Sequence, residues 1–138
     1  KAEQVASAKY LSNQAAVDTF LSSFKGEVEE RLQGFYSGIQ TLKSEGFAVD
    51  AIAPMAAIYL TVKFDLKGYV KPDGSVIEST THITQYLLQE AKLAVVPFSA
   101  FGASKESVWY RLSVGTATVA DVHASIESLR VALAKLKR

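Results

Sequence analysis

The 138-residue sequence contains no cysteine. This absence excludes disulfide bonds, zinc sites built on thiolates and thiol nucleophiles, although it says little about the cellular compartment. Only two histidines are present, His82 and His123, and neither has another histidine three or four residues away. A metal site needs three or four converging ligands. We therefore predict no metal site and expect both histidines on the surface.

Strong net charge and long apolar runs are also missing. The formal net charge is +1, so the chain has neither the basic surface that binds nucleic acid nor an acidic tail. No apolar run approaches the ~20 residues that cross a bilayer, and residues 1–10 lack the apolar core of a signal peptide. We expect a cytoplasmic protein that binds neither nucleic acid nor membrane. Because the chain begins at Lys1, within helix-like sequence, we expect a processed product or a piece of a longer protein.

Apolar periodicity predicts the first helices. Hydrophobic residues make up 49% of the chain, which is enough for one core in a single domain. Between residues 17 and 42 large apolar residues recur every three or four positions, as one face of a long amphipathic helix requires. Gly46 can adopt the left-handed conformation that ends such a helix. Residues 1–11 predict a separate short helix, broken near residues 12–13.

Alternating hydrophobicity predicts strands in the second half. Residues 58–65 alternate between apolar and polar, which is typical of a strand with one core face. Residues 109–114 alternate in the same way, with Tyr110, Leu112 and Val114 toward the core. The apolar run at residues 93–96, ended by a proline, is consistent with a strand buried on both faces or with a short helical segment.

Turn and capping residues separate these elements. The sequence KPDG at residues 71–74 is typical of a type I turn, so residues 68–75 are expected to form an exposed loop. Residues 99–107, which are small and polar around Gly102, also read as a loop.

Two further helices complete the fold. Residues 79–90 predict a helix with Thr80 or Thr81 as its N-cap. Thr118 and Asp121 resemble a capping box that starts a helix with an apolar stripe to the C-terminus. The order helix, strand, helix, strand, strand, helix predicts an α+β fold: a small β-sheet with helices packed on one face, including the long N-terminal amphipathic helix and the C-terminal helix.

Few residues carry recognisable chemistry. The carboxylates at residues 27–30 are expected on a solvated helix face. Neither a Gly-x-Ser-x-Gly elbow nor a Walker sequence occurs, and residues 102–105 are too short for a phosphate-binding loop. Lys105 lies between two polar residues and is expected to be a solvated side chain, because lysines that form Schiff bases are usually activated by burial or a neighbouring cation.

Arg111 is the most distinctive residue, because it interrupts an otherwise apolar predicted strand. Its planar group with five N–H donors can bind a carboxylate with two parallel hydrogen bonds. The alternative is that Arg111 lies on the solvent face of a half-buried strand. The local pattern leaves both interpretations open.

Three short segments resemble a known family. Residues 94–102 read AVVPFSAFG, which is similar to A-V-V-P-G-S-A-F-G with Phe98 in place of a glycine. Residues 110–113, YRLS, are similar to V-R-L-S. Residues 54–60, PMAAIYL, resemble P-x-G-A-F-Y-L, with Ala56 in place of a glycine and isoleucine in place of phenylalanine. These patterns resemble the C-terminal small domain of class I and II aminotransferases, which belong to the pyridoxal-phosphate fold type I group.

The resemblance implies a function for Arg111 and an active site that is shared between two domains. Arg111 would bind the α-carboxylate of an amino acid or 2-oxo acid substrate, with the loop from Phe98 to Lys105 near the cleft. The lysine that binds pyridoxal 5'-phosphate, the aspartate that pairs with its ring nitrogen and most phosphate ligands would lie in a large domain that precedes this sequence. Residues 1–13 would then be a helical lead-in from that domain, and residues 14–138 the small domain.

Further expectations follow from the same resemblance. This span alone should hold no catalytic or cofactor-binding residue and should be inactive, whereas the parent protein would act in amino acid metabolism as a homodimer. The alternative is a free-standing, non-catalytic α+β binding or interaction module in which Arg111 captures a partner's carboxylate or faces solvent.

Overall fold

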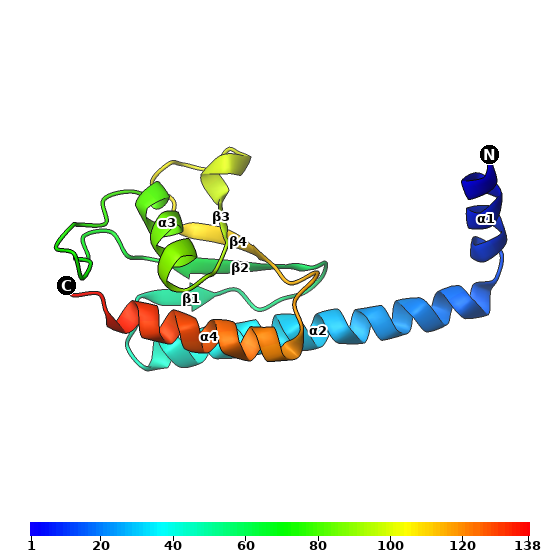
Figure 1. The fold of residues 1–138 in the computed structure, drawn as a ribbon, viewed down its shortest axis with the longest axis horizontal. Helices are drawn as coiled ribbons and strands as arrows, with labels where there is room; N and C mark the ends of the chain where they lie inside the picture. Colours follow the sequence, from blue (N-terminus) through cyan, green and yellow to red (C-terminus); the bar gives the residue numbers. More distant parts are fainter.

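A four-stranded antiparallel sheet organises the computed structural model, which describes all 138 residues (Figure 1). The elements, in chain order, are α1 (Ala2–Leu11), α2 (Gln14–Ser44), β1 (Val49–Ala51), β2 (Tyr59–Phe64), α3 (Thr80–Glu90), β3 (Val96–Pro97), the 3-10 helix η1 (Phe98–Phe101), β4 (Trp109–Ser113) and α4 (Val119–Ala134). The strand order is β1-β2-β4-β3. The α+β class predicted from the sequence is therefore confirmed.

The pairing of β2 with β4 forms the centre of the sheet. Leu60 lies opposite Leu112, and Thr61 lies opposite Arg111. Because side chains alternate along a strand, this register places the apolar residues of both strands on one face. The alternation predicted for both strands is confirmed, since Leu60, Leu112 and Tyr110 are all buried.

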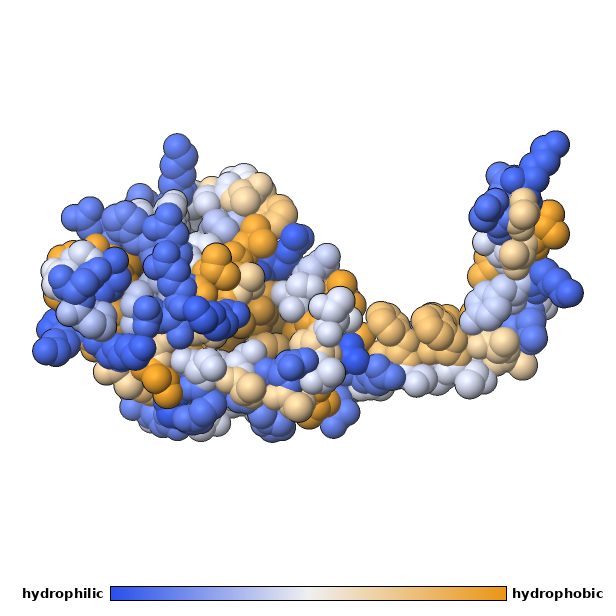
Figure 2. All heavy atoms as spheres, viewed as in Figure 1, coloured by the Kyte–Doolittle hydropathy of each residue, from blue (hydrophilic) through white to orange (hydrophobic).

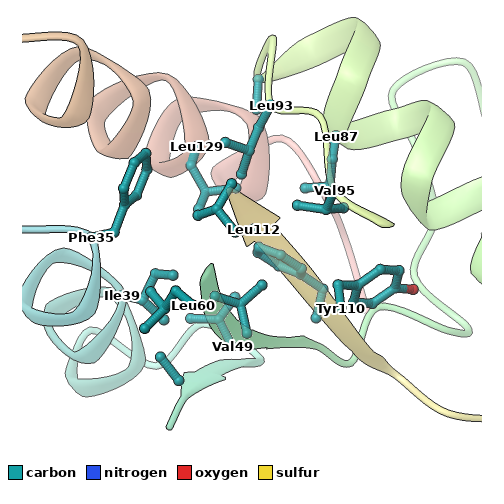
Figure 3. Close-up of a cluster of buried hydrophobic side chains, with 14 of the residues drawn as sticks. Phe35, Ile39, Val49, Leu60, Leu87, Leu93, Val95, Tyr110, Leu112 and Leu129 are labelled. Atoms are coloured by element: carbon teal, nitrogen blue, oxygen red, sulfur yellow. The ribbon is translucent and has the colours of Figure 1, made fainter. Parts of the chain in front are cut away.

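Helices α2 and α4 pack side by side against that apolar face (Figure 1). Figure 3 shows Phe35 and Ile39 of α2 in one cluster with Leu60 of β2 and Leu112 of β4. Leu129 of α4 and Leu87 of α3 belong to the same core of buried side chains. The core therefore occupies the layer between the helices and one face of the sheet, as the sequence predicts.

Helix α2 is longer than the predicted 17–42 and differs between its two halves. Its buried residues are confined to the C-terminal part. The N-terminal part projects away from the sheet and leads to α1, which has no buried residue (Figure 1). The predicted break between the two helices is confirmed at Ser12–Asn13, where the Asn13 side chain accepts a hydrogen bond from the backbone N–H of Ala16. Residues 1–27 form an arm outside the core.

Several predicted boundaries are wrong. The N-cap of α3 is Ser79, whose hydroxyl accepts from the backbone N–H of His82, and not Thr80 or Thr81. Helix α4 ends at Ala134 instead of continuing to the C-terminus, because the backbone of Lys137 forms two hydrogen bonds with that of Val70.

The segment before β4 also differs from its prediction. Residues 93–96 are not a strand buried on both faces, because Ala94 and Val96 are exposed while Leu93 and Val95 are buried. Only Val96–Pro97 pairs, with β4 at the edge of the sheet. Residues 98–101, predicted in part as loop, form η1, which ends at Gly102 with φ of 91°.

Elements of only a few residues are too short to show a hydrophobic period in the sequence. Strand β1 has only three residues and was not predicted, because so few positions do not establish an alternating pattern. Gly46 has φ of 97°, which confirms the predicted left-handed residue after α2. No helix in the structure has both the length and the apolar character needed to cross a membrane.

The contact between α2 and α4 generates a prediction at Gly38. A Cβ atom there would lie 2.5 Å from Cγ1 of Ile126 and 2.7 Å from its Cδ1. We expect Gly38→Ala to lower the free energy of unfolding by up to about 2 kcal/mol, because overpacking costs ~1–3 kcal/mol and the helix propensity gained offsets ~1 kcal/mol of it. Urea denaturation followed by circular dichroism measures the change.

Gly26 provides the matched control, since it lies in the same helix and a Cβ atom added there would have nothing within 4 Å. Gly26→Ala should be neutral or stabilising by up to about 1 kcal/mol. Equal effects of the two substitutions would contradict the close approach of α2 to α4 at Gly38.

The buried hydroxyl of Tyr110 generates a second prediction. This oxygen has no hydrogen-bond partner, and burial, followed by the charge of Asp65, raises the pKa of Tyr110. The hydroxyl of Tyr86, in contrast, donates to the carbonyl of Ala132 at 2.7 Å. Because an unsatisfied buried group costs about 1–3 kcal/mol, Tyr110→Phe should raise the free energy of unfolding by ~1 kcal/mol, whereas Tyr86→Phe should lower it by a similar amount. Thermal denaturation of both variants tests this, and equal losses would show that the Tyr110 hydroxyl is satisfied.

Candidate functional site

The face of the sheet opposite the core carries the polar and aromatic residues of β2 and β4. Alternation places Tyr59, Thr61 and Lys63 of β2 on this face, together with Trp109, Arg111 and Ser113 of β4. All six side chains are half-buried or exposed. The prediction that Tyr110, Leu112 and Val114 face the core is therefore confirmed, and Arg111 lies on the opposite face.

Strand pairing on both sides holds the backbone of Arg111. Residue 111 lies opposite Thr61 of β2 and opposite Val96 of β3. A position paired on both sides has little backbone freedom, because its neighbours constrain it from two directions. Arg111 therefore projects from a rigid part of the open face.

Two aromatic rings contact the guanidinium of Arg111. Its Cζ atom lies 4.4 Å from the centroid of the Tyr59 ring and 4.3 Å from that of the Phe101 ring. Both distances are within the range of cation–π attraction. Phe101 comes from η1, which lies within the segment from Phe98 to Lys105 that the resemblance places near the substrate cleft.

The charge of Arg111 has no partner of opposite sign within the chain. The guanidinium forms neither an ion pair nor a hydrogen bond with another residue. Arg31 differs, because it binds Glu27 at 2.7 Å and the carbonyl of Gly115 at 3.3 Å. Arg130 likewise binds Glu45 at 2.9 Å. The five N–H donors of Arg111 are thus available to an external acceptor such as a carboxylate.

Other predicted residues lie away from this site. His82 and His123 are exposed, as expected, and the Nδ1 atom of His82 accepts a hydrogen bond from the backbone N–H of Glu78. Lys105 is exposed, as expected of a solvated lysine. Glu29 and Glu30 are exposed on α2, which agrees with the prediction of a solvated helix face.

A groove that the sequence reasoning missed lies between α2 and the loop before β2. It has a volume of about 530 Å³ and is lined by Phe24, Val28 and Leu32 of α2 and by residues 54–58. Met55 in this loop is 95% exposed. The sequence did contain a signal for this groove. The apolar stripe of the long helix begins well before the first residue of that helix that is buried in the core.

Ala56 and Phe98 stand where the family motifs have glycine, and the backbone at these two positions does not require glycine. Neither Ala56 nor Phe98 has a positive φ, whereas the neighbouring Ala57 has φ of 62°. Phe98 is the first residue of η1, and its ring packs edge-on against that of Phe101 at a centroid distance of 6.4 Å. The loops therefore form without the two glycines.

Comparison with known proteins agrees with these features. Residues 2–129 match the family described as aminotransferase class I and II. The chain is 30% identical over 128 residues to an aspartate aminotransferase of Rhizobium meliloti, covering 90% of this chain and 30% of that protein. It is 36% identical over 86 residues to a probable aspartate/prephenate aminotransferase of Rickettsia typhi, covering 62% of this chain and 19% of that protein.

A solved structure shows the same fold. The crystal structure of the aspartate aminotransferase from Rhizobium meliloti superposes with a TM-score of 0.71 and 28% identity, covering 86% of this chain and 28% of that one. The chain belongs to the class I and II aminotransferases. It spans between about a fifth and a third of the length of these relatives.

Proposed function

We propose that this chain is the C-terminal part of a pyridoxal-phosphate-dependent aminotransferase that moves an amino group between an amino acid and a 2-oxo acid. Arg111 would bind the substrate's α-carboxylate. The observation that carries the proposal is the unpaired guanidinium of Arg111, which a rigid strand presents on the open face of the sheet. In a site closed to water, such a group would orient the substrate while the cofactor supplies the carbanion chemistry.

We infer that the residues of this chain would not form a cofactor site by themselves. Pyridoxal 5'-phosphate needs a lysine that can form an imine, and such lysines are activated by burial or by a nearby cation. No lysine in the structure is buried. Lys43 and Lys135 instead form ion pairs with Asp50 and Glu90. We therefore place the cofactor site in the parent protein's large domain, outside this chain.

The arm supports the proposal that a large domain of the parent protein covers part of this chain. Figure 2 shows apolar residues along the extended part of α2. Phe20 is 57% exposed there and stacks on Phe24 with a centroid distance of 6.0 Å. Residues 1–13 would pack with the large domain, and residues 14–138 would form the small domain. In the homodimer that we propose for the parent protein, a cytoplasmic enzyme of amino acid metabolism, most of the interface would also lie outside this chain.

Aspartate is the first amino donor to test, because the relatives from Rhizobium meliloti and Rickettsia typhi both carry aspartate in their names. In the complete protein, Arg111→Lys should raise KM for L-aspartate and lower kcat/KM about 10- to 100-fold, because an ammonium does not reproduce the paired hydrogen bonds. Steady-state kinetics measure both constants.

Arg138→Lys is the control for this substitution. Arg138 also lacks a carboxylate partner, but it lies at the C-terminus beside Tyr69, at 5.9 Å from the ring centroid. Its replacement should leave the kinetics unchanged. Wild-type kinetics in Arg111→Lys would remove Arg111 from the substrate site.

The isolated 138-residue chain should neither transaminate nor bind pyridoxal phosphate at a specific lysine. The reason is that all its lysines are exposed or half-buried, whereas lysines that form Schiff bases are usually activated by burial or a neighbouring cation. Incubation with pyridoxal phosphate, reduction with borohydride and mass spectrometry of the peptides test this. Stoichiometric labelling of one lysine would contradict the expectation, and the complete protein serves as the positive control.

A further inference from the structure

We propose that Tyr59, Phe98 and Phe101 form an aromatic clamp that holds the guanidinium of Arg111 in the orientation needed to receive a carboxylate. The three aromatic residues would be positioning residues, acting through Arg111. This inference rests on the proposed function, because it explains how the arginine is arranged before the substrate arrives.

The clamp restricts the rotations of the Arg111 side chain that strand pairing leaves free. Pairing with β2 and β3 fixes its backbone, but the long side chain keeps several rotatable bonds. The rings of Tyr59 and Phe101, at 4.4 and 4.3 Å from Cζ, restrict those bonds. The faces of a guanidinium contact aromatic rings favourably, while its N–H groups point outward from its edge and remain free for hydrogen bonds.

The two rings that contact Arg111, those of Tyr59 and Phe101, come from separately anchored elements. Tyr59 lies on β2, two residues before Thr61, the direct partner of Arg111, so the two side chains share a face as diagonal neighbours. Phe101 is the last residue of η1, which follows β3 directly. The clamp therefore joins β2, which lies on one side of β4, to η1, which follows β3 on the other side of β4.

Phe98 supports Phe101. Its ring meets the Phe101 ring at 76° with centroids 6.4 Å apart, an edge-to-face arrangement that aromatic pairs favour. Phe98 stands at the position where the resembling motif has glycine, which has no side chain to make this contact. In this protein the additional ring limits the movement of Phe101, which is itself 53% exposed.

Restraint before binding should strengthen carboxylate binding, because less side-chain freedom is lost when the complex forms. The effect should be similar for the ground state and the transition state, since the carboxylate does not react. Loss of a ring should therefore raise KM and leave kcat nearly unchanged. A structural defect that misaligned the whole site would lower kcat as well.

The experiment uses the complete protein with L-aspartate as substrate and succinate as a non-reacting dicarboxylate. Phe101→Ala and Tyr59→Ala should each raise KM for aspartate and the calorimetric Kd for succinate about two- to fivefold, the range that exposed cation–π contacts support. Phe101→Tyr and Tyr59→Phe retain a ring and should restore wild-type values. Phe98→Gly should give a smaller rise, about twofold, as an indirect contact would.

A double-mutant cycle separates this inference from the proposed function. In an Arg111→Met background, Phe101→Ala should have no further effect on succinate binding, because no cation remains for the ring to position. Arg138→Ala, which removes the other cation–π contact of an arginine, should leave KM and Kd unchanged.

Two different results would overturn the two claims. If Arg111→Lys alone leaves succinate affinity unchanged, the proposed role of Arg111 fails and the clamp fails with it. If Arg111→Lys weakens binding but Phe101→Ala and Tyr59→Ala do not, or act equally in both backgrounds, only the clamp is wrong. A fall in kcat without a rise in KM would also overturn it.

Discussion

The antiparallel pairing of β2 with β4 is the constraint on which the other features depend. Side chains alternate along both strands, so a register that buries Leu60 and Leu112 must place Arg111 on the opposite face. A shift by one residue would bury a guanidinium without a counter-ion and expose the core, and both changes are costly. The same register brings Tyr59 close enough to contact Arg111. Packing of the core and placement of the charged group therefore have one cause.

Helix α2 combines two environments in one continuous element. Its C-terminal part is held by the sheet and by α4, with Gly38 allowing the close approach of Ile126. Its N-terminal part has no partner in the chain and presents an apolar surface that continues into the groove beside residues 54–58. The chain belongs to a family in which the compared relatives are much longer. The exposed apolar surface is therefore explained if a large domain of the parent protein covers it. This interpretation favours an aminotransferase part over a free-standing module.

The hydrophobic pattern of the sequence predicted most of the helices and strands, because a long element repeats its pattern several times. The period of α2 extends over many turns, the alternation of β4 extends over five residues, and the Thr118–Asp121 capping box is observed as predicted. Short elements carry too few positions for a period, which explains why β1 and η1 were missed. The end of α4 was misplaced because a hydrogen-bonded pair between Val70 and Lys137, remote in sequence, stops it.

The sequence by itself determined the fold class, the two faces of β2 and β4, and the choice of Arg111 as the candidate substrate residue. These features depend on alternation within a single segment and on short motifs. Only the tertiary structure decided the surroundings of Arg111. The Tyr59 and Phe101 rings come from elements 52 and 10 residues from it, and no local pattern reports that they meet its guanidinium. The absence of a carboxylate partner was likewise decided by the fold, because any of the 14 acidic residues could have reached Arg111 in another arrangement of the chain.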